Sequence, residues 1–174
     1  MAAIRYPSFA GFRASSKASS NAKKANRSTN TVAELRLHAA LRELGLRFRT
    51  HSISIPGKPD VVFRSAKVAV FCDGDFWHGR NWRRLRQLLE KRANADYWIA
   101  KIGANRRRDA SINKLLEAEG WLVLRCWETD VRADAAAIAN HVARILRRRQ
   151  RKGTGRTGPK ATLHDQRLRT DRRA

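Results

Sequence analysis

The pattern of apolar and polar residues predicts a helix over residues 31–45 as the first regular element. Thr31 and Glu34 form a T-x-x-E capping box, in which each side chain bonds the backbone N–H of the other residue. The apolar face that follows at helical spacing consists of Leu37, Ala40, Leu41 and Leu44. Gly45 ends this pattern, as glycine commonly does at helix C-termini.

Short apolar runs after this helix predict β-strands. Residues 46–55 form the first run and end at a Pro-Gly pair. Residues 59–63 (PDVVF) and 67–73 (KVAVFCD) are separated by a tight turn, which predicts a β-hairpin. The hairpin would bring the start of one strand beside the end of the other.

The remaining pattern predicts a long helix, a strand and a last helix. The long helix covers residues 94–119, the strand is GWLVLRCWE (120–128), and the last helix is DAAAIANHVARILRRR (134–149). A helix, three strands, a long helix, a strand and a helix in this order predict an α/β fold with a mixed sheet.

Charge divides the chain into three segments. The formal net charge is +23, with 38 Lys and Arg against 15 Asp and Glu, and such an excess indicates a polyanionic partner. We therefore predict a basic disordered arm (1–28), a globular domain (29–146) and a basic tail (147–174), with the tails tracking nucleic acid. Solvated tails are the alternative; neither tail has the amphipathic stripe of a membrane anchor.

The two cysteines, Cys72 and Cys126, lie in apolar runs without zinc-ligand spacing, which argues against a disulfide framework or a zinc finger. No window approaches 18 apolar residues. These features predict a reduced cytoplasmic protein, although an Arg- and Ser-rich transit peptide within residues 1–28 is an alternative.

Two acids flank the predicted hairpin. Asp60 precedes one strand and Asp73 ends the other, so both carboxylates are expected to approach each other. Each acid alone has a structural explanation as a turn residue. As a pair at the two strand ends in a very basic protein, they predict a metal site.

The loop after Asp73 carries His78 and two adjacent aromatics, Phe76 and Trp77. His78 is placed to act as a general base or acid, or else is a surface histidine. One aromatic is expected to project and to wedge into a DNA base step, unless both fold down as a small cluster.

The long helix has a polar interruption in its apolar stripe. Trp98, Ile102, Asn105, Asp109, Ile112 and Leu116 share one face. Asn105 and Asp109 are polar groups that need partners if buried. Asp109 is therefore expected either at a polar functional site or paired with a nearby arginine, such as Arg106 at the edge of the stripe, while the capping box alone explains Glu34.

The motifs PGKPDVVF, VFCDGDFWHG, YWIAKIGANRRRD and GWLVLRCWE together resemble the very short patch repair (Vsr) endonucleases over residues 31–130. The resemblance implies a restriction-endonuclease-like fold of the PD-(D/E)xK type, with three α/β/α layers around a mixed central sheet. It also implies a Mg²⁺-dependent enzyme that nicks one strand of double-stranded DNA at T:G mismatches.

The same resemblance assigns roles to residues of this chain. Asp60 matches a metal-ligand aspartate, and Cys72 lies at a position that also coordinates magnesium. His78 matches the catalytic histidine, Asp109 an acid that assists it, and Glu34 an active-site glutamate. The aromatics that wedge into the duplex correspond to Phe76, Trp77 and Trp98, and we add Asn105 as a DNA contact.

This chain departs from the family pattern at several positions. Asp73 stands where relatives have a further active-site histidine. Asp75, Arg80, Trp82 and Thr129 stand where relatives hold zinc, so no structural zinc is expected.

The substrate alternatives are other DNA, such as a restriction, defence or branched-DNA target, and a non-enzymatic DNA-binding role. A monomer associated with the bacterial nucleoid is expected.

Overall fold

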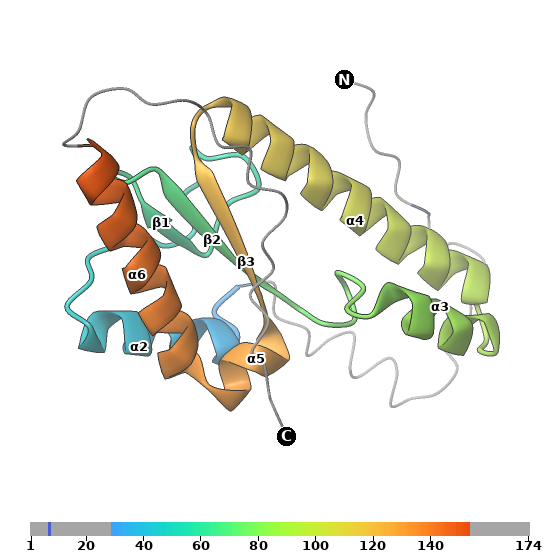
Figure 1. Cartoon of the computed structure of the whole chain (residues 1–174). Coiled ribbons are helices and arrows are strands. Elements are labelled where there is room, and N and C mark those ends of the chain that lie inside the picture. Colours follow the sequence, from blue (N-terminus) through green and yellow to red (C-terminus); the bar gives the residue numbers. More distant parts are fainter. Residues whose placement is uncertain (1–6, 8–28, 154–174) are drawn as a thin grey trace.

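The computed structural model describes Pro7 and residues 29–153 (Figure 1). The predicted arm 1–28, apart from Pro7, and the tail from residue 154 lie outside the described residues. The elements are α2 (Val32–Glu43), β1 (Val61–Phe63), β2 (Val68–Asp73), α3 (Trp82–Glu90), α4 (Ala95–Ala118), β3 (Leu122–Trp127), α5 (Glu128–Ala133) and α6 (Ala135–Gly153). Because α6 ends at Gly153, it runs past the domain boundary predicted at residue 146. Within this part of the chain, no helix is long and apolar enough to cross a membrane.

The sheet is small and mixed, with strand order β1-β2-β3. β1 and β2 form the predicted antiparallel hairpin, with Val61 opposite Val70. β3 pairs with β2 in parallel, with Cys72 opposite Cys126. The α/β class and the mixed sheet predicted from the sequence are therefore confirmed.

Side chains of β2 alternate between two apolar clusters because successive strand residues point to opposite faces. Val68 and Val70 pack with residues of α2 and α6, including Leu37 and Val142. Ala69 and Phe71 belong to a second cluster that contains Leu116 of α4. The strand that ends at Asp73 is thus covered from both sides, which fixes the position of its carboxyl end (Figure 1).

The predicted boundaries of α2 and α4 agree with the structure to within two residues, and α6 extends four residues beyond its predicted end. Thr31 is the N-cap of α2, and its hydroxyl accepts the Glu34 N–H at 3.3 Å. The predicted face of α2 is buried except for Leu44, which is the C-cap and exposed. The stripe on α4 is also formed, with Ile102, Asn105, Asp109 and Leu116 buried.

The strand predicted over residues 46–55 was wrong. Arg49 makes one antiparallel bridge with Val62, and the chain then turns at His51, which has a positive φ of 45°. A residue in that conformation cannot continue an extended strand. Two helices, α3 and α5, were not predicted because both are short and polar on most of their surface.

Candidate active site

Asp60 lies at the entrance to β1 and is held from behind. Its Oδ2 accepts the backbone N–H of Cys72 on β2 at 2.7 Å. The ring of buried His38 lies 3.2 Å from the Asp60 carbonyl oxygen. The neighbouring strand and α2 therefore orient this acid before any ligand binds.

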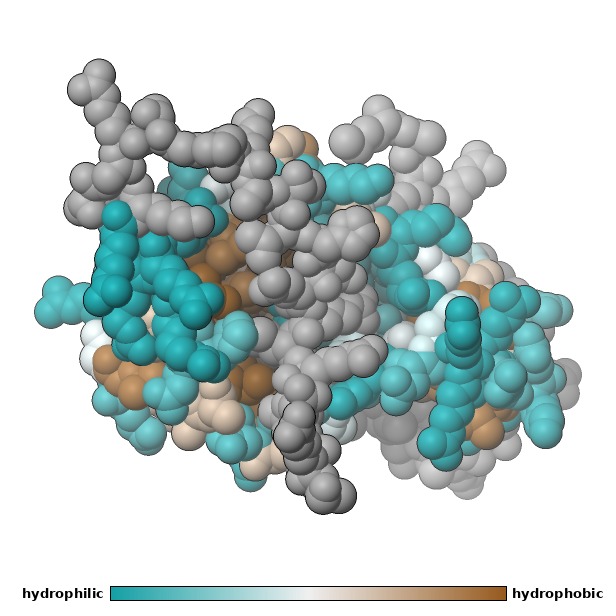
Figure 2. Space-filling model, in the orientation of Figure 1, coloured by the Kyte–Doolittle hydropathy of each residue, from teal (hydrophilic) through white to brown (hydrophobic). Residues whose placement is uncertain are grey.

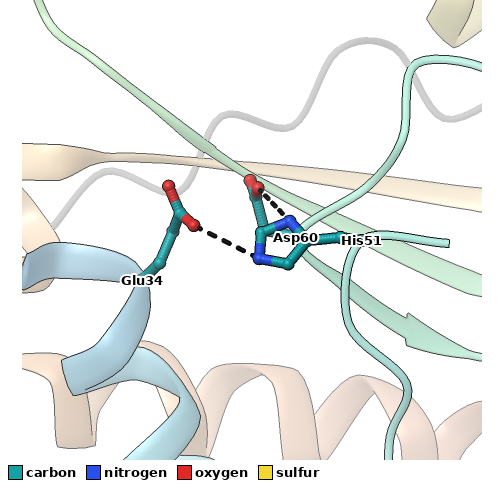
Figure 3. A group of neighbouring side chains, drawn as sticks. All are labelled: Glu34, His51 and Asp60. Carbon is teal, nitrogen blue, oxygen red and sulfur yellow. Dashed lines mark ion pairs between the residues drawn. The ribbon is translucent and has the colours of Figure 1, made fainter. Parts of the chain in front are cut away.

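Three side chains converge at this point, and we call them the Asp60 cluster: Glu34, His51 and Asp60 (Figure 3). His51 Nε2 lies 3.6 Å from Glu34 Oε2, and His51 Nδ1 lies 3.8 Å from Asp60 Oδ1. One potential ligand atom from each residue falls within 4.8 Å of the others. Among the described residues, no Lys or Arg side chain is recorded within ion-pair distance of these two carboxylates, and the His51 ring is their one ion-pair partner.

The environment of Asp60 disfavours its charged form. Burial raises the pKa of Asp60 to about 7, and the nearby charges of Glu34 and Asp73 act in the same direction. The hydrogen bond from the Cys72 N–H and, to a smaller extent, the charge of Arg125 oppose this rise. A cation bound beside Asp60 would stabilise the charged form of this carboxylate.

Glu34 serves two sites with one carboxylate. Its Oε1 accepts the Thr31 hydroxyl at 2.9 Å, and its Oε2 accepts the Asn30 N–H at 2.8 Å. The Thr31 half of the predicted capping box is therefore formed, whereas the Glu34 carboxylate bonds the Thr31 hydroxyl and the Asn30 N–H in place of the Thr31 N–H. These bonds also fix Glu34 with Oε2 facing His51.

A second group of charged residues lies nearby, and we call it the His78 cluster: Asp73, His78, Asp109 and Arg125. His78 Nδ1 lies 2.6 Å from Asp109 Oδ2 and 3.5 Å from Asp73 Oδ1. The structure therefore brings His78 and Asp109 together as the sequence predicted, across the space between the loop after β2 and the middle of α4.

Arg125 supplies the buried positive charge of this cluster, and the more exposed Arg108 lies 3.3 Å from Asp109 Oδ1. Its Nε and Nη2 donate to the two oxygens of Asp73, both at 2.7 Å, and Nη2 lies 3.2 Å from Asp109 Oδ1. Although burial raises the pKa of Asp109, the His78 hydrogen bond and the charge of Arg125 hold it below its ordinary value. Arg106, considered from the sequence as a partner for Asp109, lies instead over the ring of Trp82 at 5.3 Å.

Asp73 and Cys72, the other two predicted metal ligands, have different surroundings from Asp60. Asp73 is a neighbour of Asp60, but both of its oxygens bond Arg125. The Cys72 thiol packs against the α2 and α6 cluster, and its hydrogen bond with Cys126, together with burial, raises its pKa above the usual range. The magnesium roles of Asp73 and Cys72 stay predictions, and the geometry favours the Asp60 cluster instead.

The three predicted wedge aromatics form one half-buried group. Ring centroids lie 5.2 Å apart for Phe76 and Trp77, 5.5 Å for Phe76 and Trp98, and 5.8 Å for Trp77 and Trp98. Buried Asn105 donates to the Trp77 carbonyl oxygen at 2.8 Å. Asn105 thus anchors the loop, and its predicted DNA contact stays a prediction.

Three of the positions that the family resemblance matches to zinc ligands, Asp75, Arg80 and Thr129, join Asp130 in a polar network, which we call the loop clamp. Arg80 pairs with Asp75 at 3.0 Å and with Asp130 at 2.8 Å, and it also contacts the Thr129 hydroxyl. Asp75 accepts the Thr129 N–H at 3.1 Å. The loop clamp ties the loop after β2 to the start of α5.

A basic surface lies on α3. The side chains of Arg83, Arg84 and Arg86 on α3 are exposed, and hydrophilic residues cover much of the side on which α3 lies (Figure 2). Arginine-rich surfaces of this kind suit the phosphates of a nucleic acid.

Sequence reasoning missed His51 and Arg125. His51 was placed in a strand, where a lone histidine carries no signal. Arg125 interrupts the apolar run LVLRCW, and a charged residue within a buried strand was the signal that could have identified it.

Comparison with known proteins identifies the family. The family model described as DNA mismatch endonuclease Vsr matches residues 14–84. The Type II nicking enzyme V.NmeDIP of Neisseria meningitidis serogroup C is 45% identical over 127 residues, which cover 73% of this chain and 84% of that protein. The Type II nicking enzyme V.HpaIIP of Haemophilus parainfluenzae is 40% identical over 109 residues, or 63% and 76% of the two chains.

The DNA mismatch endonuclease Vsr of Escherichia coli (strain K12) is 34% identical over 117 residues, which cover 63% of this chain and 73% of that enzyme. These relatives are endonucleases, so the non-enzymatic alternative is set aside. The family model and these relatives show that the chain belongs to the Vsr family of DNA endonucleases and is an endodeoxyribonuclease.

Proposed function

We propose that this endonuclease depends on a divalent metal ion, Mg²⁺ or Mn²⁺, held by the Asp60 cluster, and that it nicks one strand of double-stranded DNA. The proposal rests on two neighbouring groups of side chains. The Asp60 cluster has two carboxylates without a Lys or Arg partner, and the His78 cluster has a histidine bonded to a carboxylate. Hydrolysis of a phosphodiester needs both charge neutralisation at the phosphate and a group that moves protons.

The Asp60 cluster has the donors that a divalent cation requires. Two carboxylates and an imidazole are ligands for Mn²⁺ and related ions, and carboxylates suit Mg²⁺. Burial is the main cause of the raised pKa of Asp60, and repulsion from the other acids adds to it. A cation bound at Asp60 would offset both effects by stabilising the charged carboxylate. When bound, the ion supplies positive charge beside the scissile phosphate.

His78 is the residue proposed to move protons. Asp109 engages its Nδ1 at 2.6 Å, which leaves Nε2 as the atom that exchanges a proton with water or with the leaving oxygen. Asp109 sets the orientation and tautomer of the ring, and the loop clamp holds the loop that carries it.

The aromatic group is proposed to select the substrate. Phe76, Trp77 and Trp98 would enter the duplex where base stacking is weakest, such as at a mispair. We propose the T:G mismatch as the substrate, because an E. coli relative is named a mismatch endonuclease. Other relatives are named only Type II nicking enzymes, so another deformable or modified site is the second candidate.

The remaining proposals follow from the family. Two apolar clusters on opposite sides of β2 support a three-layer, restriction-endonuclease-like arrangement. We further propose a monomer that acts in the bacterial cytoplasm near the nucleoid, with the basic tails adding phosphate contacts.

The proposal is tested by nicking assays with Asp60→Asn on matched, T:G-mismatched, methylated and branched duplexes, in Mg²⁺ and in Mn²⁺. We expect loss of nicking by about 10²-fold or more, the scale of removing a main electrostatic group, with DNA affinity retained. Glu43→Gln, an exposed acid at the end of α2, is the matched control. Undiminished nicking by Asp60→Asn would rule out the metal assignment.

The same panel tests the substrate. Trp77→Ala should reduce the preference for the mismatched duplex over the matched one. If wild-type protein cleaves the methylated or branched duplex faster than the T:G duplex, the second candidate replaces the first.

A further inference from the structure

Arg125 is a buried arginine whose charge is fully compensated by neighbours. Its side chain is 5% exposed, and an unpaired guanidinium there would cost several kcal/mol. Asp73 takes two of its N–H groups, and Asn113 Oδ1 accepts a third, from Nη1, at 3.1 Å. Its guanidinium carbon also lies 4.6 Å from the centre of the Phe71 ring.

The sheet explains how Arg125 reaches this position. Arg125 on β3 pairs in register with Phe71 on β2, two residues before Asp73. Residues two apart on a strand point to the same face, so Arg125 and Asp73 share the face that α4 covers. The long side chain spans the distance from the sheet to Asp109 on α4.

Arg125 is the cation shared by two buried carboxylates that face the same histidine nitrogen, and Arg108 of α4 contacts only Asp109, at 3.3 Å. Asp73 and Asp109 approach His78 Nδ1 at 3.5 and 2.6 Å. Two carboxylates this close repel each other unless a cation lies between them or one takes up a proton. Arg125 lies within 3.2 Å of both, which allows both acids to keep fixed positions around the ring.

We propose that Arg125 is a positioning residue for catalysis. Its planar guanidinium bonds both oxygens of Asp73 and contacts Asp109, which fixes the positions of both carboxylates. Asp109 then holds the His78 ring in one orientation and one tautomer, with the proton on Nδ1. The proposal rests on the proposed proton-moving role of His78. It gives Asp73 a role as a support for the His78 cluster in place of metal binding.

Lysine and arginine differ in the feature that matters here. Lysine keeps the positive charge but is a point charge without the planar fork that bonds both oxygens of one carboxylate. Arg125→Lys therefore separates charge balance, which supports folding, from geometry, which supports the orientation of His78.

The experiment compares Arg125→Lys, Arg125→Met, Asn113→Ala and His78→Ala with wild type in single-turnover nicking of a T:G duplex. Arg149→Lys on α6, where Arg149 donates to the Gly120 carbonyl oxygen, is the matched control. Folded fraction, DNA affinity and Mn²⁺ affinity are measured for each protein. The tautomer of His78 is read from ¹⁵N NMR.

We expect Arg125→Lys to lower the nicking rate of the folded protein by about 10–100-fold, the range for removing a supporting contact behind a site. DNA and Mn²⁺ affinities should stay at the wild-type level, and the NMR signal should show a mixture of His78 tautomers. Asn113→Ala should show the same pattern with a smaller loss. If Arg125→Met misfolds, these two variants carry the test.

Two results would overturn the inference in distinguishable ways. An unchanged rate in folded Arg125→Lys, together with a large loss in His78→Ala, would show that Arg125 is only structural while the proposed role of His78 holds. An unchanged rate in His78→Ala would remove the proposed proton-moving role and this inference with it.

Discussion

The Asp60 cluster and the His78 cluster contain the same kinds of groups, two carboxylates and one histidine, and lie beside the end of the same strand. They differ in their cations. The His78 cluster includes buried Arg125, which bonds both oxygens of Asp73 and contacts Asp109. In the Asp60 cluster, within the described part of the chain, only the imidazole of His51 faces the acids.

We infer from this difference that acid spacing alone does not define a metal site. A carboxylate that already has a guanidinium partner has little to gain from a metal ion, whereas a buried carboxylate without one has a raised pKa. Burial raises the pKa of both acids, but at Asp109 the His78 hydrogen bond and the charge of Arg125 outweigh it, whereas the pKa of Asp60 rises to about 7.

The largest expected effect is on the nicking rate and concerns the proton-moving role proposed for the His78 cluster. His78→Ala should lower the nicking rate by about 10²–10⁴-fold, the usual contribution of a general acid or base, because no other described imidazole pairs with Asp109. Rapid-quench nicking at saturating DNA measures it. A nicking rate of His78→Ala within a few-fold of wild type would contradict a catalytic role for the His78 cluster.

A smaller effect separates them by metal affinity. His51→Ala should weaken Mn²⁺ binding by about 10–100-fold, and raising the metal concentration should restore nicking. Because imidazole favours transition-metal ions over Mg²⁺, the loss should be larger for Mn²⁺ than for Mg²⁺. Calorimetric titration of both ions tests this, and equal losses for the two ions would argue against direct ligation by His51.

The raised pKa of Asp60 predicts a pH-dependent stability without metal. Above about pH 7 the folded protein bears the cost of burying the charged carboxylate, and this cost disappears as the pH falls towards the ordinary value of 3.8. Asp60→Asn should therefore raise the free energy of unfolding at pH 8 by no more than about 4 kcal/mol, and by less at pH 5.

Urea unfolding in the presence of a chelator, at both pH values, measures this difference. Asp96→Asn, an exposed acid in the first turn of α4, is the control and should show no such pH dependence. A variant that is less stable than wild type at pH 8 would contradict the account of Asp60.

The smallest expected effect concerns the loop clamp, which holds the loop that carries His78. Arg80→Ala leaves Asp130 and Asp75 without their shared partner and should cost about 1–3 kcal/mol of stability. Thermal unfolding with and without a zinc chelator checks this. A melting temperature of wild-type protein that falls when zinc is chelated would contradict the polar clamp.

Much of the fold was predictable because local pattern and tertiary packing agree. The capping box at Thr31, the hairpin between β1 and β2, and the long helix α4 all follow from apolar periodicity and caps. The predicted strand over residues 46–55 failed because one backbone conformation, at His51, overrides the apolar pattern.

The site was predictable only in part. Asp60, His78 and Asp109 stood out through motif and spacing, and the structure brings the last two into contact. His51 and Arg125 were missed because their roles arise from contacts between residues far apart in sequence, such as the 52 positions that separate Arg125 from Asp73.

Metal binding to matched variants of the two clusters tests the central claim most directly. Mn²⁺ affinity is measured by titration for wild type, for Glu34→Gln and Asp60→Asn in one cluster, and for Asp73→Asn and His78→Ala in the other. The account predicts that only the first two variants lose affinity, by about tenfold or more. Loss of Mn²⁺ affinity in folded Asp73→Asn, with wild-type affinity in Glu34→Gln and Asp60→Asn, would contradict it.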